Sequence, residues 1–310
     1  MRHTTTPTSR QIRRPTLLGE ATRAGLSRDA LKRDVDAGRL VRPFRGVYAP
    51  TGLDSARDLI VAAALHAGPE AVAVLGSAAT LHGLAGVPGR LAPQIALPPR
   101  LERRQRDGID LHFWDLPDED ITTMDGLRVT TLARTVADVC RLLPRFVAVS
   151  CVDSAIDAGL LDPGDLDGIA RGMARRRNCV AGRRHLGEAR SGAQSPLETR
   201  VRLRACDAGL APDVLQVPVY SPGAVLLGFG DMGYRLPSGG LLVVEADGRS
   251  VHEQPAAVLH DRRRQNAFLA VPGVLMLRFT WDDTRSASYI PAALRPILTR
   301  SGWRPNRARL

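Results

Sequence analysis

The chain has 310 residues, and 44% of them are hydrophobic, which is enough to bury a core and excludes a wholly disordered or fibrous protein. At roughly 150 residues per domain, this length predicts two domains or two lobes. No apolar run approaches the roughly 18 residues that a membrane-spanning helix needs, and the basic, polar N-terminus lacks the pattern of a secretory signal. We therefore expect a cytoplasmic protein that makes no contact with a membrane.

The formal net charge of +11 is concentrated at the two ends of the chain. Residues 1–50 hold eleven Lys or Arg against four Asp or Glu, and residues 299–310 hold four Arg and no acid. A polyanion such as nucleic acid would therefore meet positive charge first at these ends. The alternative is a solvated surface in an arginine-rich protein. Because only 4% of the residues are aromatic, which disfavours a base-stacking single-strand binder, the expected partner is double-stranded DNA.

Several classes of site are excluded by motif. The sequence contains no phosphate-binding loop, no dinucleotide-binding glycine pattern and no G-x-S-x-G element. Its four cysteines are widely spaced and form no C-x-x-C pair, so neither a zinc site nor a disulfide framework is predicted.

The first fifty residues carry the pattern of two helices followed by a hairpin. One helix is expected over Gln11–Arg23. A second is expected over Arg28–Ala37, with Ser27 as its N-cap and Gly38 as its stop. Two short strands follow within residues 39–49.

This order predicts a winged helix-turn-helix domain over residues 10–50. In such a domain one helix enters the major groove and the hairpin holds backbone phosphates. The expected DNA-contacting side chains are Arg28, Lys32, Arg39, Arg42 and Arg45. The alternative is a small packing module with incidental surface charge.

The middle of the chain, residues 51–190, is expected to be mixed but mostly helical. Strand candidates lie at 95–97 and 109–113, and helices are expected at 131–142, 146–158 and 166–175.

Three short blocks resemble the abortive-infection AbiEi-type antitoxins. They are Gly38–Tyr48, Ser77–Leu84 and Thr131–Asp138, and the resemblance covers roughly residues 10–160. It implies an N-terminal winged helix and DNA binding rather than chemistry. An antitoxin of this type would also have a cognate toxin protein as a partner.

The last third of the chain predicts a mixed sheet flanked by helices, in the order α-β-β-β-α-β over residues 195–298. A buried strand ends in Glu245 and Asp247, whose alternation places both side chains on one face. Hairpin-like pairing would bring Asp231 close to Glu245. Carboxylates so placed repel one another unless a cation lies between them, and hard oxygen ligands suit Mg²⁺.

This region resembles the very-short-patch-repair-like branch of the PD-(D/E)xK nucleases. The elements that carry the resemblance are Glu198, Asp231, Glu245, Asp247, Gly248, His252, Asp261, Arg264 and the block at 277–280. It implies that Asp231 and Glu245 are ligands of Mg²⁺ or Mn²⁺ and that Glu198 lines the metal site. It further implies that Asp247 is catalytic, although many members of the superfamily have a lysine there.

The remaining residues of the pattern would serve the same reaction. His252 would act as a general base or contact a phosphate, and Asp261 and Arg264 would line the pocket. The sequence departs from the family around Asp231, where flanking glycines are expected to loosen the strand.

Each of these residues also has a purely structural interpretation. Ser195-x-x-Glu198 is a capping box, and Asp247-Gly248 is a turn former. Asp261 and Arg264 form an i,i+3 pair on a helix, and Asp231 can be a loop residue.

The sequence therefore predicts an α+β protein with a winged helix-turn-helix at 10–50, a middle region at 51–190, a restriction-endonuclease-like lobe at 195–298 and a basic tail at 299–310. The leading hypothesis is an Mg²⁺-dependent DNA endonuclease that hydrolyses phosphodiester bonds. The first rival is a non-enzymatic DNA-binding regulator of the antitoxin type with a degenerate nuclease lobe. A protein-interaction module that binds no DNA is the third class.

Overall fold

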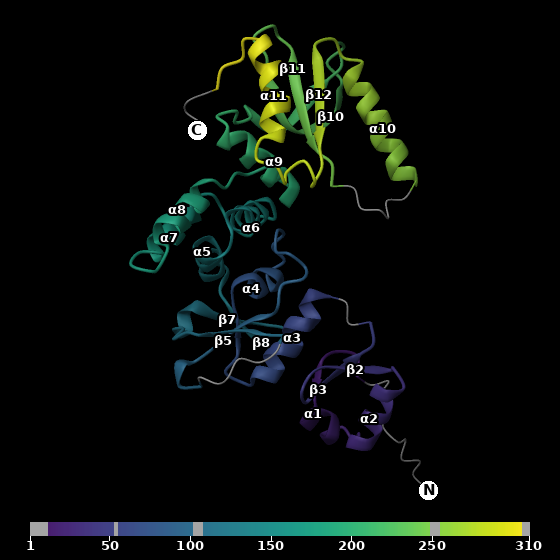
Figure 1. Ribbon diagram of the computed structural model, residues 1–310, viewed down its shortest axis with the longest axis vertical. Coiled ribbons are helices and arrows are strands. Elements are labelled where there is room, and N and C mark those ends of the chain that lie inside the picture. Colours follow the sequence, from purple (N-terminus) through teal and green to yellow (C-terminus); the bar gives the residue numbers. More distant parts are fainter. Residues whose placement is uncertain (1–11, 53–54, 102–107, 249–254, 306–310) are drawn as a thin grey trace. The chain divides into compact units, whose positions relative to one another are not determined.

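The computed structural model describes residues 12–52, 55–101, 108–248 and 255–305 (Figure 1). The expected α+β class is confirmed. Helices accompany three separate sheets of three, four and five strands, and these sheets are mixed or antiparallel. The chain divides into two compact units. The first contains the residues up to Leu143 together with Asp167–Arg183, and the second contains Pro144–Leu166 and the residues from Arg184 onward.

The first unit begins with a small sheet and two helices. In chain order these are β1 (Thr16–Leu17), α1 (Leu18–Arg23), α2 (Arg28–Asp36), β2 (Leu40–Phe44) and β3 (Val47–Pro50). The sheet order is β1-β3-β2, all antiparallel. The predicted first helix is too long at its start, because Thr16 and Leu17 pair with Tyr48 and Val47 as a strand.

The remainder of the first unit is a five-stranded sheet with helices against it. Its elements are α3 (Ala56–Ala67), β4 (Val72–Ala73), α4 (Leu75–Leu81), β5 (Gln94–Leu97), η2 (Pro99–Leu101), β6 (Asp110–Phe113), η3 (Asp118–Asp120), β7 (Ile121–Met124), β8 (Leu127–Thr130), α5 (Leu132–Leu142), α7 (Asp165–Gly172) and the first part of α8 (Cys179–Gly187). The strand order is β6-β5-β4-β8-β7. Alanines of α3 pack on β5, where small side chains allow a close approach.

More strand is present here than the sequence analysis predicted. Strands β5 and β6 were expected, whereas β4, β7 and β8 were not. Strand β4 is only two residues long and carries almost no periodic signal. Strands β7 and β8 form a hairpin over Asp125-Gly126, both of which have positive φ, and this Asp-Gly pair is a hairpin signal that the analysis missed.

The second unit is a four-stranded sheet between helices. Its elements are α6 (Arg145–Asp157), α9 (Pro196–Asp207), β9 (Val214–Tyr220), β10 (Leu226–Arg235), β11 (Leu241–Ala246), α10 (Pro255–Leu269), β12 (Val274–Phe279) and α11 (Tyr289–Arg300). The order is β12-β11-β10-β9, with β11 and β12 parallel and the other pairs antiparallel. Residues from α9 and α11 share one core with β10 and β11, and Phe268 of α10 belongs to another core on the same sheet (Figure 1).

The end of the chain differs from the expected basic tail. Arg300 is the last residue of α11, and Trp303 is buried in the core of the second unit. The Trp303 indole donates a hydrogen bond to Asp213 Oδ2 at 3.0 Å. Trp303 therefore anchors this segment to the fold while Arg300 and Arg304 stay exposed, and residues 306–310 lie outside the described residues.

Among the residues that the structure describes, no helix is both long and apolar enough to cross a membrane.

Candidate functional site

The basic side chains predicted to contact DNA are all exposed on the N-terminal elements. Helix α2 is capped by Ser27, whose hydroxyl accepts from Ala30 N at 3.1 Å, and it buries Leu31 in the core. Arg28 and Lys32 of the same helix are exposed, as are Arg42 and Arg45 of the hairpin. The helix is thus anchored on one face and presents cations on another.

Arg39 differs from the other four predicted contacts. It is also exposed, but its Nε donates to Asp34 Oδ1 at 2.8 Å, and its Nη2 contacts the same oxygen. An arginine whose charge is already paired is a weaker contact for a phosphate.

The turn of the hairpin is held in place by backbone hydrogen bonds. Gly46 has φ +81°, which suits glycine, and its carbonyl accepts from Leu18 N at 2.8 Å. The Arg45 carbonyl lies 2.9 Å from His66 Nδ1, and the His66 ring stacks on Phe44. The exposed arginines of the hairpin therefore project from an ordered backbone.

The carboxylates of the nuclease pattern converge at one end of the sheet in the second unit. Asp231 lies inside β10, directly before Met232, which pairs with Val244 of β11. Its Oδ2 accepts a hydrogen bond from Ala246 N at 2.7 Å. The structure therefore places Asp231 beside Glu245, and the alternative that Asp231 is a loop residue is wrong.

Two of the glycines near Asp231 allow the neighbouring strands to pack closely. A Cβ on Gly230 would lie 2.3 Å from Val243 Cγ1, and a Cβ on Gly233 would lie 2.8 Å from Val217. Only glycine allows the neighbouring strands this approach. Strand β10 extends from Leu226 to Arg235, but its pairing with β9 shifts register between Leu226 and Gly228, so the expected loosening of the strand remains a prediction.

Two arginines lie among these carboxylates. Arg264 Nη1 is 2.8 Å from Glu245 Oε1, and its Nη2 donates to Asp261 Oδ1 at 2.9 Å. Arg278 Nη2 donates to Asp247 Oδ2 at 3.0 Å and to Asp261 Oδ2 at 3.1 Å. We call Asp231, Glu245, Asp247, Asp261, Arg264 and Arg278 the Glu245 cluster.

Burial changes the proton affinity of the cluster. Desolvation raises the pKa values of Asp231 and Glu245 despite the arginines, and each carboxylate beside another acid is raised further. Burial also acts to raise the pKa of Asp261, but hydrogen bonds from Arg264 and Arg278 outweigh it and lower that pKa. The two arginines therefore neutralise the rim of the cluster better than its buried centre.

Glu198 takes part in capping the N-terminus of α9, and its carboxylate is repelled by the charge of Asp231 in this cluster. The Ser195 hydroxyl accepts from Glu198 N at 3.1 Å, and Glu198 Oε2 accepts from Gln194 N at 2.9 Å, as in a capping box displaced by one residue. Its pKa is raised to about 7, chiefly by burial and further by the charge of Asp231. The capping interpretation of Glu198 is therefore confirmed by these hydrogen bonds, and its place in a metal site remains a prediction.

A divalent cation fits this arrangement poorly. The donor atoms are carboxylate oxygens, as Mg²⁺ requires, but a guanidinium already lies at hydrogen-bonding distance from Glu245 and another bridges Asp247 and Asp261. Within the described residues, no group of three or more His, Cys, Asp or Glu side chains is arranged to hold a metal ion. His252, the predicted general base, lies outside the described residues.

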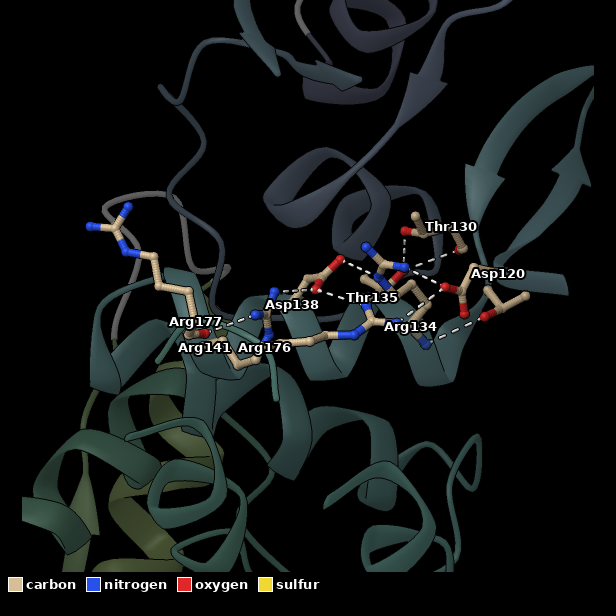
Figure 2. Close-up of polar contacts among 9 residues, drawn as sticks. Asp120, Thr130, Arg134, Thr135, Asp138, Arg141, Arg176 and Arg177 are labelled. Carbon is tan, nitrogen blue, oxygen red and sulfur yellow. Dashed lines mark hydrogen bonds and ion pairs between the residues drawn. The ribbon is translucent and has the colours of Figure 1, made fainter. Parts of the chain in front are cut away.

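A second charged cluster, which the sequence analysis did not predict as a site, lies in the first unit. Asp138 of α5 is buried, and it accepts from Arg134 Nε at 2.6 Å and from Arg141 Nη2 at 2.8 Å. Figure 2 shows Arg134 extending to Asp120, and Arg176 lies 3.5 Å from the same carboxylate. We call Asp120, Arg134, Asp138, Arg141 and Arg176 the Asp138 cluster.

The Asp138 cluster ties separate segments of the first unit together. Arg141 Nη1 donates to the Arg177 carbonyl at 2.8 Å, while the Arg177 side chain points away (Figure 2). Thr130 and Thr135 share a hydrogen bond of 2.7 Å at the start of α5. The i,i+4 spacing of Arg134 and Asp138 was the available sequence signal, but it is typical of a surface pair and gives no indication of Asp120 or Arg176.

Comparison with known protein families matches residues 71–188 to the AbiEi antitoxin C-terminal domain. The matched segment runs from β4 to the end of α8, so it contains the Ser77–Leu84 and Thr131–Asp138 blocks and the Asp138 cluster. The hairpin block at Gly38–Tyr48 and the Glu245 cluster lie outside it.

Two proteins of Mycobacterium tuberculosis, from strain ATCC 25618 / H37Rv and strain CDC 1551 / Oshkosh, are each 29% identical to the chain over 264 residues. The similarity covers 84% of this chain and 92% of each relative, so it extends well beyond the matched family segment. Both relatives are uncharacterized proteins.

Proposed function

We propose that the chain is a DNA-binding regulator of the antitoxin type, with a winged helix-turn-helix at its N-terminus and a C-terminal lobe that does not catalyse. The match of residues 71–188 to an antitoxin domain is the observation that carries this proposal. It favours the regulator over the endonuclease that the sequence analysis placed first.

The N-terminal elements support the DNA-binding half of the proposal. Helix α2 is short, capped and anchored by Leu31, and its exposed Arg28 and Lys32 are one helical turn apart. In the proposed complex this helix lies in the major groove with both cations against the flanking phosphates, and Arg42 and Arg45 hold further phosphates. A duplex is the proposed ligand because a helix and the hairpin beside it can reach a groove and the backbone that borders it.

The Glu245 cluster supports the non-catalytic half of the proposal. Arg264 and Arg278 act as internal counter-ions for carboxylates that a nuclease would leave open for a cation. Displacing them would break the ion pair to Glu245 and both hydrogen bonds to Asp261. These internal counter-ions occupy the positions around Glu245, Asp247 and Asp261 that a metal ion would need, although they do not neutralise all four carboxylates.

Duplex binding is tested on the full chain by fluorescence anisotropy across a series of salt concentrations. Replacing Arg28 and Lys32 together by alanine should weaken binding and reduce the slope of log K against log salt by ~1.8 if each residue contacts one phosphate. Arg39→Ala is the matched control, because its charge is already paired with Asp34, and it should change the slope little. Unchanged affinity in the double variant would refute binding by α2.

A cognate toxin protein is the second partner in this proposal. It follows from the antitoxin-type match alone, so it is tested by co-expression with the neighbouring gene product and a growth assay. Rescue of growth by the full chain supports the antitoxin role, and a toxin that remains lethal argues against it.

The metal-dependent endonuclease is kept as a second candidate because of one specific observation. Asp231 repels both Glu198 and Glu245 and raises the pKa values of these two carboxyl groups. Mg²⁺ or Mn²⁺ would relieve this repulsion if the arginines withdrew.

Calorimetry with Mg²⁺ and Mn²⁺, followed by plasmid nicking, separates the two candidates. The wild type is compared with Asp231→Asn and with Glu245→Gln. Metal binding and nicking that are both lost in the variants would establish the nuclease. A wild type that binds neither metal and nicks no plasmid supports the regulator.

A further inference from the structure

Two arginines that have no counter-ion among the described residues, Arg200 and Arg204, lie against one aromatic ring in the second unit. The Phe146 ring, in the first turn of α6, has the guanidinium of Arg200 4.4 Å and that of Arg204 5.0 Å from its centroid. Arg145 lies 5.8 Å from the same ring. Three guanidinium groups thus share one aromatic side chain.

These arginines differ sharply in how their charge is compensated. Arg145 is paired with Glu188 and Asp207, at 2.6 and 2.8 Å. Among the described residues, no carboxylate lies within ion-pair distance of Arg200 or Arg204. Arg204 donates only to the carbonyl of Thr284, and Arg200 Nε is buried without a hydrogen-bond partner.

Two unpaired like charges at this spacing are unfavourable for the isolated protein. Arg200 and Arg204 are one turn apart on α9, where like charges destabilise a helix. Burial lowers the pKa of Arg200, and the charge of Arg204 lowers it further. Stacking on Phe146 offsets part of this cost, but a neutral ring leaves the charge in place.

Stacking leaves the two Nη groups of Arg200 and Nη1 of Arg204 available as donors, since Thr284 takes only Nε and Nη2 of Arg204. A guanidinium that lies over a ring directs its N–H bonds outward in its own plane, where a phosphate accepts two of them at once. The N-terminus of α6 at Pro144 has no side-chain cap, so the first turn adds positive partial charge beside Phe146.

We propose that Arg200 and Arg204, held against Phe146 at the start of α6, form a binding site for a phosphate group. The phosphate comes either from a nucleic-acid backbone or from a free phosphate ion. The site is independent of the winged helix, since all of its residues belong to the second unit.

The test compares full-length wild type with Arg200→Gln and with the double variant Arg200→Gln, Arg204→Gln. Arg285→Gln is the matched control, because Arg285 is an exposed arginine of the same unit that is already paired with Asp282. Thermal unfolding is followed in chloride and in inorganic phosphate at equal ionic strength. We expect phosphate to raise the unfolding temperature of the wild type and the control, to raise it less in Arg200→Gln and not to raise it in the double variant.

Stability in phosphate-free buffer separates a ligand site from a structural role. Because Arg200 repels Arg204 and makes no hydrogen bond at Nε, Arg200→Gln should unfold at the wild-type temperature or higher. A structural arginine would lower it. Arg200→Gln alone keeps the Arg204 contact to Thr284, so this comparison remains available if the double variant folds poorly.

Duplex DNA then distinguishes the two sources of phosphate. If the backbone is the ligand, the double variant reduces the salt slope of DNA binding by ~1.8 relative to the control. If free phosphate is the ligand, the thermal response is lost and the slope is unchanged. Equal thermal responses and equal slopes in wild type and double variant would overturn the proposal.

Discussion

The Asp138 cluster and the Glu245 cluster are both built from carboxylates and guanidinium groups, but guanidinium groups are in excess in the first and carboxylates in the second. The first has two carboxylates and three guanidinium groups, and the second has four carboxylates and two guanidinium groups. Asp138 is met by arginines on two sides at 2.6 and 2.8 Å. Glu245 has one such contact at 2.8 Å and a second at 3.8 Å.

This difference in charge suggests a structural role for the Asp138 cluster and a capacity of the Glu245 cluster to bind protons or cations. An acid surrounded by arginines is already satisfied, so the Asp138 cluster is expected to contribute stability and little else. The Glu245 cluster keeps carboxylates with raised pKa values at its centre, so it still responds to protons and, in principle, to cations. The following variants test this division, from the largest expected effect to the smallest.

Asp138→Asn should cause the largest loss of stability, of about 3–5 kcal/mol, because it leaves Arg141 buried without its counter-ion and removes one of the two counter-ions of Arg134. Urea denaturation measures the free energy of unfolding. The control is Asp282→Asn, which breaks an exposed pair and should cost less than about 1 kcal/mol. Similar losses in the two variants would mean that the Asp138 cluster is not structural.

Glu198→Gln should remove a pH dependence. The folded protein raises the Glu198 pKa from 4.5 to about 7, so it binds this proton more tightly than the unfolded chain does. Wild-type stability should therefore fall as the pH rises from 4.5 to about 7, by ~3 kcal/mol at most, and Glu198→Gln should not show this fall. Parallel stability curves for the two proteins between pH 4 and 8 would contradict the prediction.

Arg278→Gln should destabilise the protein by about 2 kcal/mol at pH 7, because it removes charged hydrogen bonds to Asp247 and Asp261. Those hydrogen bonds lower the Asp261 pKa, so the stability they contribute is present at neutral pH and is lost as the pH falls. The deficit of the variant should shrink in acid. Thermal unfolding with added Mg²⁺ adds a second test, since stabilisation of Arg278→Gln but not of wild type would show that the arginine occupies the place of a cation.

Ser195→Ala should have the smallest effect, about 1 kcal/mol, through loss of the N-cap of α9. The Ser195 hydroxyl also lowers the Glu198 pKa, so the loss should be larger at a pH where Glu198 is ionised than at a pH where it is protonated. Denaturation at pH 5 and pH 8 therefore separates the capping function of this helix start from the charge of Glu198.

The elements that the sequence predicted are those with strong local signals. Helix α2 has its Ser27 cap, α9 has Ser195 and Glu198, and β11 is a continuous apolar run ending in an acid. Helix α11 escaped prediction because Pro296 lies inside it and its burial depends on the core formed with β10 and β11. Local patterns carry no information about such tertiary partners.

The same limit applies to the two clusters. The proximity of Asp231 and Glu245 follows from hairpin pairing and was predictable. Arg278 reaches Asp247 only because β12 lies parallel to β11, a pairing across α10 that spacing alone does not specify. The roles of the individual residues in binding or catalysis remain predictions.

The path of the chain has a consequence for dissecting the protein. Residues 144–166 belong to the second unit, the chain then returns to the first unit for residues 167–183, and it leaves again at Arg184. No single cut therefore separates the two units, since a cut after Leu143 leaves α7 with the second unit and a cut before Arg184 leaves α6 with the first. The antitoxin-like segment at 71–188 likewise contains residues of both units, so a fragment cut at these bounds would leave each unit incomplete.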